Sequence, residues 1–176
     1  MTLTEKTAEE YEALFPPQHV YNGVSFAELN ASKTEKMHYI EFADSKSRFG
    51  IILGERGGIL RSPFSAPFGG FSQRAGQSLQ NMETAVKLLV DYAAERQKGI
   101  MITLPPLFYD ECQLSKWVSV LLRAGFRPTV DLNYHFDISR FANYRAIIDR
   151  SARNHLNRSL KSGFRLLQLN SASRDD

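Results

Sequence analysis

Three short runs of β-forming residues follow one another in the first half of the chain. Residues 37–43 and 48–55 are rich in aromatic and β-branched side chains, and residues 59–62 begin a third run. Turn-forming residues separate these runs, ending with the pair Gly57-Gly58, because glycine reaches positive φ at little cost. The pattern predicts an antiparallel meander of three strands.

Helical spacing of apolar residues follows the meander. It predicts helices over residues 78–97 and 110–124, each followed by a glycine that favours helix termination. The nearly all-apolar run 100–104 between them predicts a strand covered on both faces. The apolar positions of the first of these helices are Leu79, Met82, Val86, Leu89, Val90 and Ala93.

The two ends of the chain carry weaker signals. A helix is expected over residues 7–15, since Thr7 and Glu10 have the spacing of a capping box. Alternation over 130–136 predicts a strand, and residues 144–160 form one apolar helical stripe. Residues 164–169 resemble a last strand, and 170–176 are expected to be a disordered tail.

This order of elements predicts a mixed α/β fold, of the α+β type with a mixed sheet. We expect an N-terminal helical segment, residues 1–36, to pack on a domain formed by residues 37–169. Hydrophobic residues make up 43% of the 176 positions, which suffices for one well-formed core.

The composition limits the expected location of the protein and the kinds of ligand it can bind. One cysteine excludes a disulfide framework, and the four histidines have no metal-ligand spacing, so no metal is expected. No apolar run reaches the roughly 20 residues of a membrane helix, and the acidic N-terminus does not resemble a signal peptide. The expected location is therefore cytoplasmic, with no membrane partner.

The order of elements resembles the acyl-CoA N-acyltransferase (GNAT) fold. In that fold, the loop after the third meander strand leads into a long helix. The N-terminus of this helix holds the pyrophosphate of acyl-CoA, because its free N–H groups and dipole favour an anion. The resemblance implies acyl-CoA as the cofactor.

Two local motifs extend this resemblance to the Fem-like peptidoglycan aminoacyltransferases. Residues 61–71 (RSPFSAPFGGF) resemble a loop of that family, and residues 151–165 resemble the basic helix that closes its N-terminal half. The matching residues of the helix are Arg153, Asn154, Arg158, Lys161 and Gly163. The resemblance covers residues 37–168 and implies the first of the two GNAT-like halves of Fem-like proteins. The chain is then expected to be either a fragment of such a protein or a single-domain relative.

The segment from Gln73 to Ser78 resembles the GNAT pyrophosphate pattern, with serine at its last position. The alternative interpretation is a loop that only turns a strand into a helix. The candidate cofactor-binding residues are Gly69, Gly70, Phe71, Gln73, Arg74, Gly76 and Ser78.

Acylation of an amine requires removal of a proton, for which a carboxylate can serve as general base. Glu55 and Glu41 are candidates from the strands, although each also fits a surface carboxylate. The resemblance implies a tyrosine as general acid at the junction where Tyr109 stands, although a tyrosine there could equally cover an edge of the core.

The last part of the chain is basic. Residues 140–176 hold 8 of the 22 Lys and Arg residues but only 3 of the 19 Asp and Glu residues. Arg153, Arg158 and Lys161 are therefore candidates for binding an anion, either tRNA or a peptidoglycan precursor. The alternative is a solvated helix face, or one that packs on another domain.

The function expected from the resemblance is an N-acyltransferase or aminoacyltransferase that transfers an acyl group to an amine. The amine is either a small molecule or a peptidoglycan precursor. The alternative is a non-catalytic GNAT-like half that binds substrate or dimerises. The partner is then a second copy of the chain or a second GNAT-like half.

Overall fold

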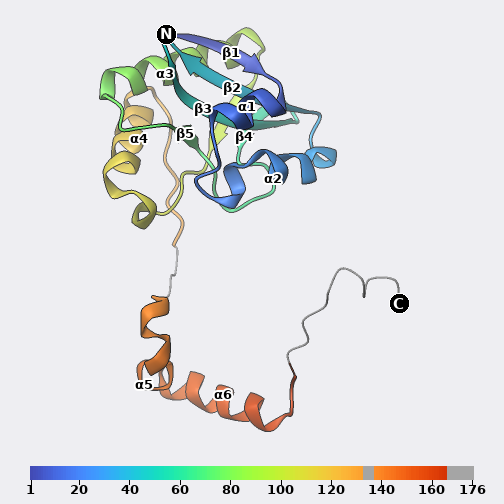
Figure 1. The fold of residues 1–176 in the computed structure, drawn as a ribbon, viewed down its shortest axis with the longest axis vertical. Helices are drawn as coiled ribbons and strands as arrows, with labels where there is room; N and C mark the ends of the chain where they lie inside the picture. Colours follow the sequence, from blue (N-terminus) through green and yellow to red (C-terminus); the bar gives the residue numbers. More distant parts are fainter. Residues whose placement is uncertain (133–136, 166–176) are drawn as a thin grey trace. The chain divides into compact units, whose positions relative to one another are not determined.

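A mixed sheet of six strands organises the first part of the protein (Figure 1). The computed structural model describes residues 1–132 and 137–165, and the chain forms two compact units, Met1–Asp131 and Leu132–Asp176. The sheet belongs to the first unit. Its strands are β1 (Thr2–Lys6), β2 (Lys36–Ala43), β3 (Ser47–Arg56), β4 (Ile59–Ser62), β5 (Phe71–Gln73) and β6 (Gly99–Ile102).

The strand order is β1-β2-β3-β4-β6, and β5 pairs with β3. All pairs are antiparallel except β4 with β6, which run parallel. The predicted mixed α/β class and the antiparallel meander β2-β3-β4 are therefore confirmed.

Strands β4 and β5 lie along the same edge of β3. The first pairs with residues 54–56 of β3 and the second with residues 49–51. The chain thus leaves the sheet after Ser62, forms a loop over residues 63–70, and returns as β5 before helix α3 begins.

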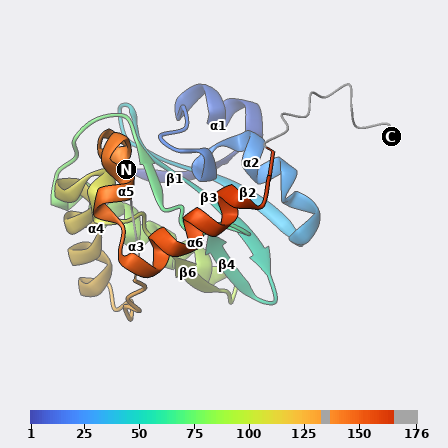
Figure 2. The same cartoon turned by 90° about the horizontal axis from the view of Figure 1, so that it is seen from below.

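Helices cover both faces of this sheet (Figure 2). Helices α3 (Leu79–Glu95) and α4 (Glu111–Arg123) contribute to the larger apolar cluster, and α1 (Ala8–Leu14) and α2 (Val24–Leu29) contribute to the smaller one. Ile51 and Leu53 of β3 belong to the larger cluster, whereas Ile52 belongs to the smaller. Because both faces of β3 are covered, apolar residues follow one another along this strand.

Side-chain caps begin the helices where the sequence predicts them. Thr7 Oγ1 accepts a hydrogen bond from the Glu10 amide at 3.2 Å, and the Thr7 amide donates to the Glu10 carboxylate at 2.9 Å. The predicted capping box is confirmed. Ser78 and Asp110 cap α3 and α4 in the same way, through the amides of Asn81 and Gln113.

The N-terminal segment contains more than the predicted helix over residues 7–15. Residues 2–6 form β1, which pairs with β2, and short 3-10 turns lie at Val20–Asn22 and Ala31–Lys33. The pattern of residues 2–6 does not predict a strand, because most of these side chains are polar and exposed, as at the edge of a sheet.

The second unit contains α5 (Tyr144–Ile147) and α6 (Arg150–Lys161), after a 3-10 segment over Ile138–Asn143. The single helix predicted over 144–160 is wrong, because Asp149 caps a new helix by accepting from the Ala152 amide at 2.9 Å. Gly163 follows with a φ of 69°.

Two predicted strands are not found where the structure describes the chain. Val130 and Leu132 lie outside any strand and are exposed, and Phe164 and Arg165 are also irregular. Alternation alone produced the first prediction, but these apolar side chains have no sheet partner among the described residues. Residues 133–136 and 166–169 of these runs, and the tail 170–176, lie outside the described residues.

Candidate functional site

The glycine pair of the predicted phosphate loop faces the interior. The Gly69 amide donates to the Thr103 carbonyl at 2.9 Å, and the Gly70 amide donates to Ser62 Oγ at 3.1 Å. Both glycines are buried, and a Cβ on Gly70 would stand 3.1 Å from Leu104. These amides hold the loop against the end of β6, so they are not free to bind a phosphate.

Phe71 is a core residue, stacked on Trp117 with ring centroids 3.9 Å apart. Gln73 ends β5, and its carbonyl accepts from Gln18. Arg74, Gly76 and Ser78 are exposed where the chain enters α3. Of the seven predicted cofactor-binding residues, these three present groups to solvent at a helix N-terminus.

Tyr109 lies in an aromatic cluster instead of near the glutamates. Its ring is half exposed and packs 5.3 Å from the ring of Phe68 and 5.9 Å from that of His19. Burial lowers the pKa of His19. Glu41 is buried and pairs with Lys6 at 3.1 Å and with the Ser47 hydroxyl. The structure therefore does not bring the predicted acid and bases together.

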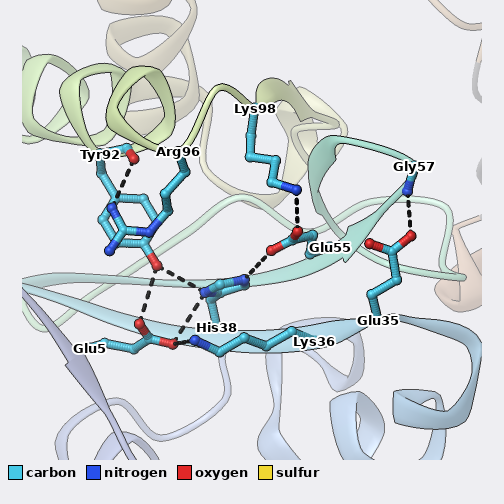
Figure 3. A network of polar contacts seen from close by, with 9 residues as sticks. All are labelled: Glu5, Glu35, Lys36, His38, Glu55, Gly57, Tyr92, Arg96 and Lys98. Atoms are coloured by element: carbon cyan, nitrogen blue, oxygen red, sulfur yellow. Dashed lines mark hydrogen bonds and ion pairs between the residues drawn. The ribbon is translucent and has the colours of Figure 1, made fainter.

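Glu55 belongs to a polar network centred on the buried side chain of His38 (Figure 3). The Glu55 carboxylate lies 3.0 Å from His38 Nε2 and 2.6 Å from Lys98 Nζ. On the other side of the ring, His38 Nδ1 lies 2.9 Å from the Tyr92 hydroxyl and 3.2 Å from Glu5. The network joins strands β1, β2 and β3 to helix α3 and the turn before β6.

The charges of this network are mutually compensated. The Lys98 ammonium, followed by His38, lowers the pKa of Glu55, and Glu55 in turn raises the pKa of Lys98. Burial raises the pKa of Glu5, but Lys36 and His38 outweigh it and the net shift is downward. Burial, with Glu5 nearby, raises the pKa of Tyr92 to about 12. A carboxylate held ionised by the Lys98 ammonium and hydrogen-bonded to His38 is a weak general base, so this arrangement favours a structural role for Glu55.

A separate pocket of about 840 Å³ lies beside β4 and β6. We call it the cationic pocket, because it is lined by three basic side chains and by no acidic one. The lining residues used below are Lys33, Arg56, Ile59, Arg61, Phe64, Ser65 and Met101. None of the site residues predicted from the sequence lines this pocket. Two local signals fall on it. Six of its lining residues belong to the 61–71 motif, and the alternation of β4 puts Arg61 on the face opposite Leu60.

The basic residues of the second unit have local roles in α6. The Arg153 guanidinium donates to the Ile148 carbonyl at 3.2 Å, which ties the start of α6 to the end of α5. Arg158 and Lys161 lie in the last turn, where positive charge complements the helix dipole. All three side chains are exposed.

The residues that the structure describes contain neither a candidate metal-ion site nor a candidate membrane-spanning helix. Over 1–132 and 137–165, no group of three or more His, Cys, Asp or Glu side chains is arranged to hold a metal ion. In the same ranges, no helix has both the length and the apolar character needed to cross a membrane.

Comparisons of the chain with protein-family models, with curated proteins and with solved structures found no match. The resemblance to GNAT and Fem-like proteins therefore rests on the motifs and the order of elements.

Proposed function

We propose that the first unit is a GNAT-like domain of an N-acyltransferase or aminoacyltransferase. In this reaction an amine nitrogen attacks the carbonyl of a thioester or ester. The new C–N bond forms, the C–S or C–O bond breaks, and the amine loses a proton while the leaving group gains one. The observation that carries the proposal is the sheet order β1-β2-β3-β4-β6 with a parallel pair at β4 and β6, joined through α3.

The donor would meet the exposed start of α3. Ser78 caps this helix, and no acidic residue lies in its first turn. Free N–H groups at this end and the nearby Arg74 side chain would favour a pyrophosphate. Gly76 is also exposed, so its backbone is accessible there.

The second candidate function is a non-catalytic half that binds a substrate. It is favoured by one specific observation: Glu55 is held by His38 and Lys98, and Glu41 by Lys6, so both predicted bases already have cationic partners. Under this alternative, catalytic groups would come from another domain or chain.

Calorimetric titration of the full chain with acetyl-CoA tests the proposal. We expect binding that disappears in Gly76→Asp, where the added carboxylate repels phosphate. A Cβ at this position has only the Gln113 side-chain amide within reach, at 3.4 Å, so the variant should fold. Arg127→Gln, an exposed change on another segment, is the matched control and should bind normally.

A transfer assay with a panel of primary amines separates the two candidates. Acylated product supports the transferase. Acetyl-CoA binding without product supports the non-catalytic half. Absence of binding at about 1 mM acetyl-CoA, the upper end of ordinary substrate affinities, would contradict the GNAT-like assignment.

A further inference from the structure

The cationic pocket lies on the sheet face opposite α3 and α4. In β4, Leu60 and Ser62 are buried, whereas Ile59 and Arg61 line the pocket. In β6, Ile100 and Ile102 pack against the α3–α4 cluster, and Met101 lines the pocket. Because side chains alternate along a strand, the parallel pair presents a floor of Ile59, Arg61 and Met101.

The loop after β4 forms one wall. The Phe64 ring packs on the backbone of Gly54, where a Cβ would stand 2.6 Å from Phe64 Cβ. The Ser65 hydroxyl accepts from Lys33 Nζ at 3.0 Å, which ties the loop to the segment before β2. Both contacts tie this wall to the sheet and to the segment before β2.

The three basic groups of the pocket lack carboxylate partners among the described residues. Lys33 Nζ donates to Asn30 Oδ1 at 2.7 Å, in addition to Ser65. Arg56 donates to the Lys33 carbonyl at 3.5 Å, and Arg61 reaches only the Met101 sulfur, at 3.4 Å. The Glu35 carboxylate accepts from the Gly57 amide at 2.8 Å and neutralises none of the three by direct pairing.

Three lysines elsewhere in the same unit do have carboxylate partners. Lys6, Lys36 and Lys98 each contact a carboxylate at 3.1 Å or less. The three cations of the pocket line one cavity without a paired carboxylate among the described residues, so their positive potentials add there. The arrangement is thus complementary to a ligand with more than one negative charge.

We infer that the cationic pocket binds an organic phosphate that carries two negative charges and an apolar or ring-bearing group. Three basic groups match a phosphate dianion better than a single carboxylate, and guanidinium groups bind phosphate through paired N–H donors. Ile59, Phe64 and Met101 provide apolar contact for the rest of the molecule. The volume of about 840 Å³ lies in the range of small-molecule sites.

Phenyl phosphate, inorganic phosphate and benzoate are suitable probes, because they separate charge from apolar contact. Titration by calorimetry at low ionic strength should show phenyl phosphate binding more tightly than either of the others. Inorganic phosphate binding as tightly as phenyl phosphate would overturn the apolar part of the inference. Benzoate binding as tightly would overturn the requirement for two charges.

Variants locate the site. Arg61→Gln should weaken phenyl phosphate binding about tenfold, since a charge-assisted hydrogen bond is lost. Met101→Glu should abolish binding by placing a carboxylate among the three cations; Met101 is 51% exposed, so the change should not disturb the core. Arg127→Gln has the same charge change as Arg61→Gln and should bind normally. Equal weakening by both would indicate general electrostatics and overturn the inference, as would no binding of phenyl phosphate to the wild-type chain.

This inference stands apart from the proposed acyl transfer. Gly76→Asp should abolish acetyl-CoA binding and leave phenyl phosphate binding intact. Met101→Glu should abolish phenyl phosphate binding and leave acetyl-CoA binding intact. Because acetyl-CoA is itself a ring-bearing organic phosphate, the variants assign its site. Loss of acetyl-CoA binding in Gly76→Asp but not in Met101→Glu supports the donor site at the start of α3, whereas loss in Met101→Glu alone contradicts the proposed function and assigns acetyl-CoA to the cationic pocket.

Discussion

The Phe64 ring lies so close to Gly54 that a Cβ on the glycine would stand 2.6 Å from Phe64 Cβ and 2.7 Å from its Cγ. Gly50, four residues earlier on the same face of β3, receives Tyr11 and Phe15 in the same way, at 2.7 Å. Two glycines in a central strand thus admit aromatic rings, Gly54 from the loop after β4 and Gly50 from the N-terminal segment. The first contact shapes the cationic pocket, and the second anchors α1.

Gly54→Ala should destabilise the protein by about 1–3 kcal/mol, because the added methyl group forces Phe64 out of its position. Urea denaturation followed by circular dichroism measures the change. Gly76→Ala is the matched control, since Gly76 has open surroundings and should change stability by less than about 0.5 kcal/mol. Equal stability of Gly54→Ala and the wild type would show that Phe64 does not pack there.

Thr7→Ala should cost about 1 kcal/mol of stability, since it removes the oxygen that accepts from the Glu10 amide. The measurement is the shift of the urea midpoint. Thr7→Ser keeps the hydroxyl and should restore most of the loss. A Thr7→Ser variant as unstable as Thr7→Ala would contradict the capping role.

Tyr92→Phe removes a hydroxyl that lies 2.9 Å from His38 Nδ1 and 3.2 Å from Glu5. We expect a loss of about 1–3 kcal/mol, because the buried His38 nitrogen loses a partner while the ring packing stays. Thermal unfolding measures this effect. Tyr21→Phe removes a hydroxyl with no hydrogen bond to the described residues and is the control.

Stability should fall at acidic pH, with Glu55 as one cause. Its pKa in the folded protein lies below the ordinary 4.5, so the unfolded chain binds protons more readily. The stabilisation is therefore present above pH 4.5 and is lost as the pH falls through the lowered pKa. The urea midpoint of unfolding should therefore decline as the pH is lowered below 4.5.

Glu55→Gln should flatten this decline, because the substituted amide does not titrate. Glu12→Gln changes an exposed carboxylate with no ion pair to the described residues and should leave the slope unchanged. A Glu55→Gln variant with the same acid slope as the wild type would show that the ion pairs of Glu55 with His38 and Lys98 do not stabilise the fold.

Local signals account for most of the elements. Thr7 with Glu10, Gly57 with Gly58, and the apolar stripe of α3 act through neighbours within a few residues, so the chain itself specifies them. Strand β1 escaped prediction because an edge strand carries little apolar pattern. The predicted helix over 144–160 failed because Asp149 acts as a cap only in the backbone conformation that begins α6.

The sequence by itself determined the caps, the turns and the α/β alternation, since these depend on backbone preferences and on spacing along one helix or strand. Only the tertiary structure decided which polar groups meet. His38 reaches Glu55 across the β2–β3 pairing and Tyr92 across the sheet–helix contact. Arg56 and Arg61 share a pocket with Lys33 because the fold closes around them. Contacts of this kind depend on register and packing between distant segments, and no local pattern encodes them.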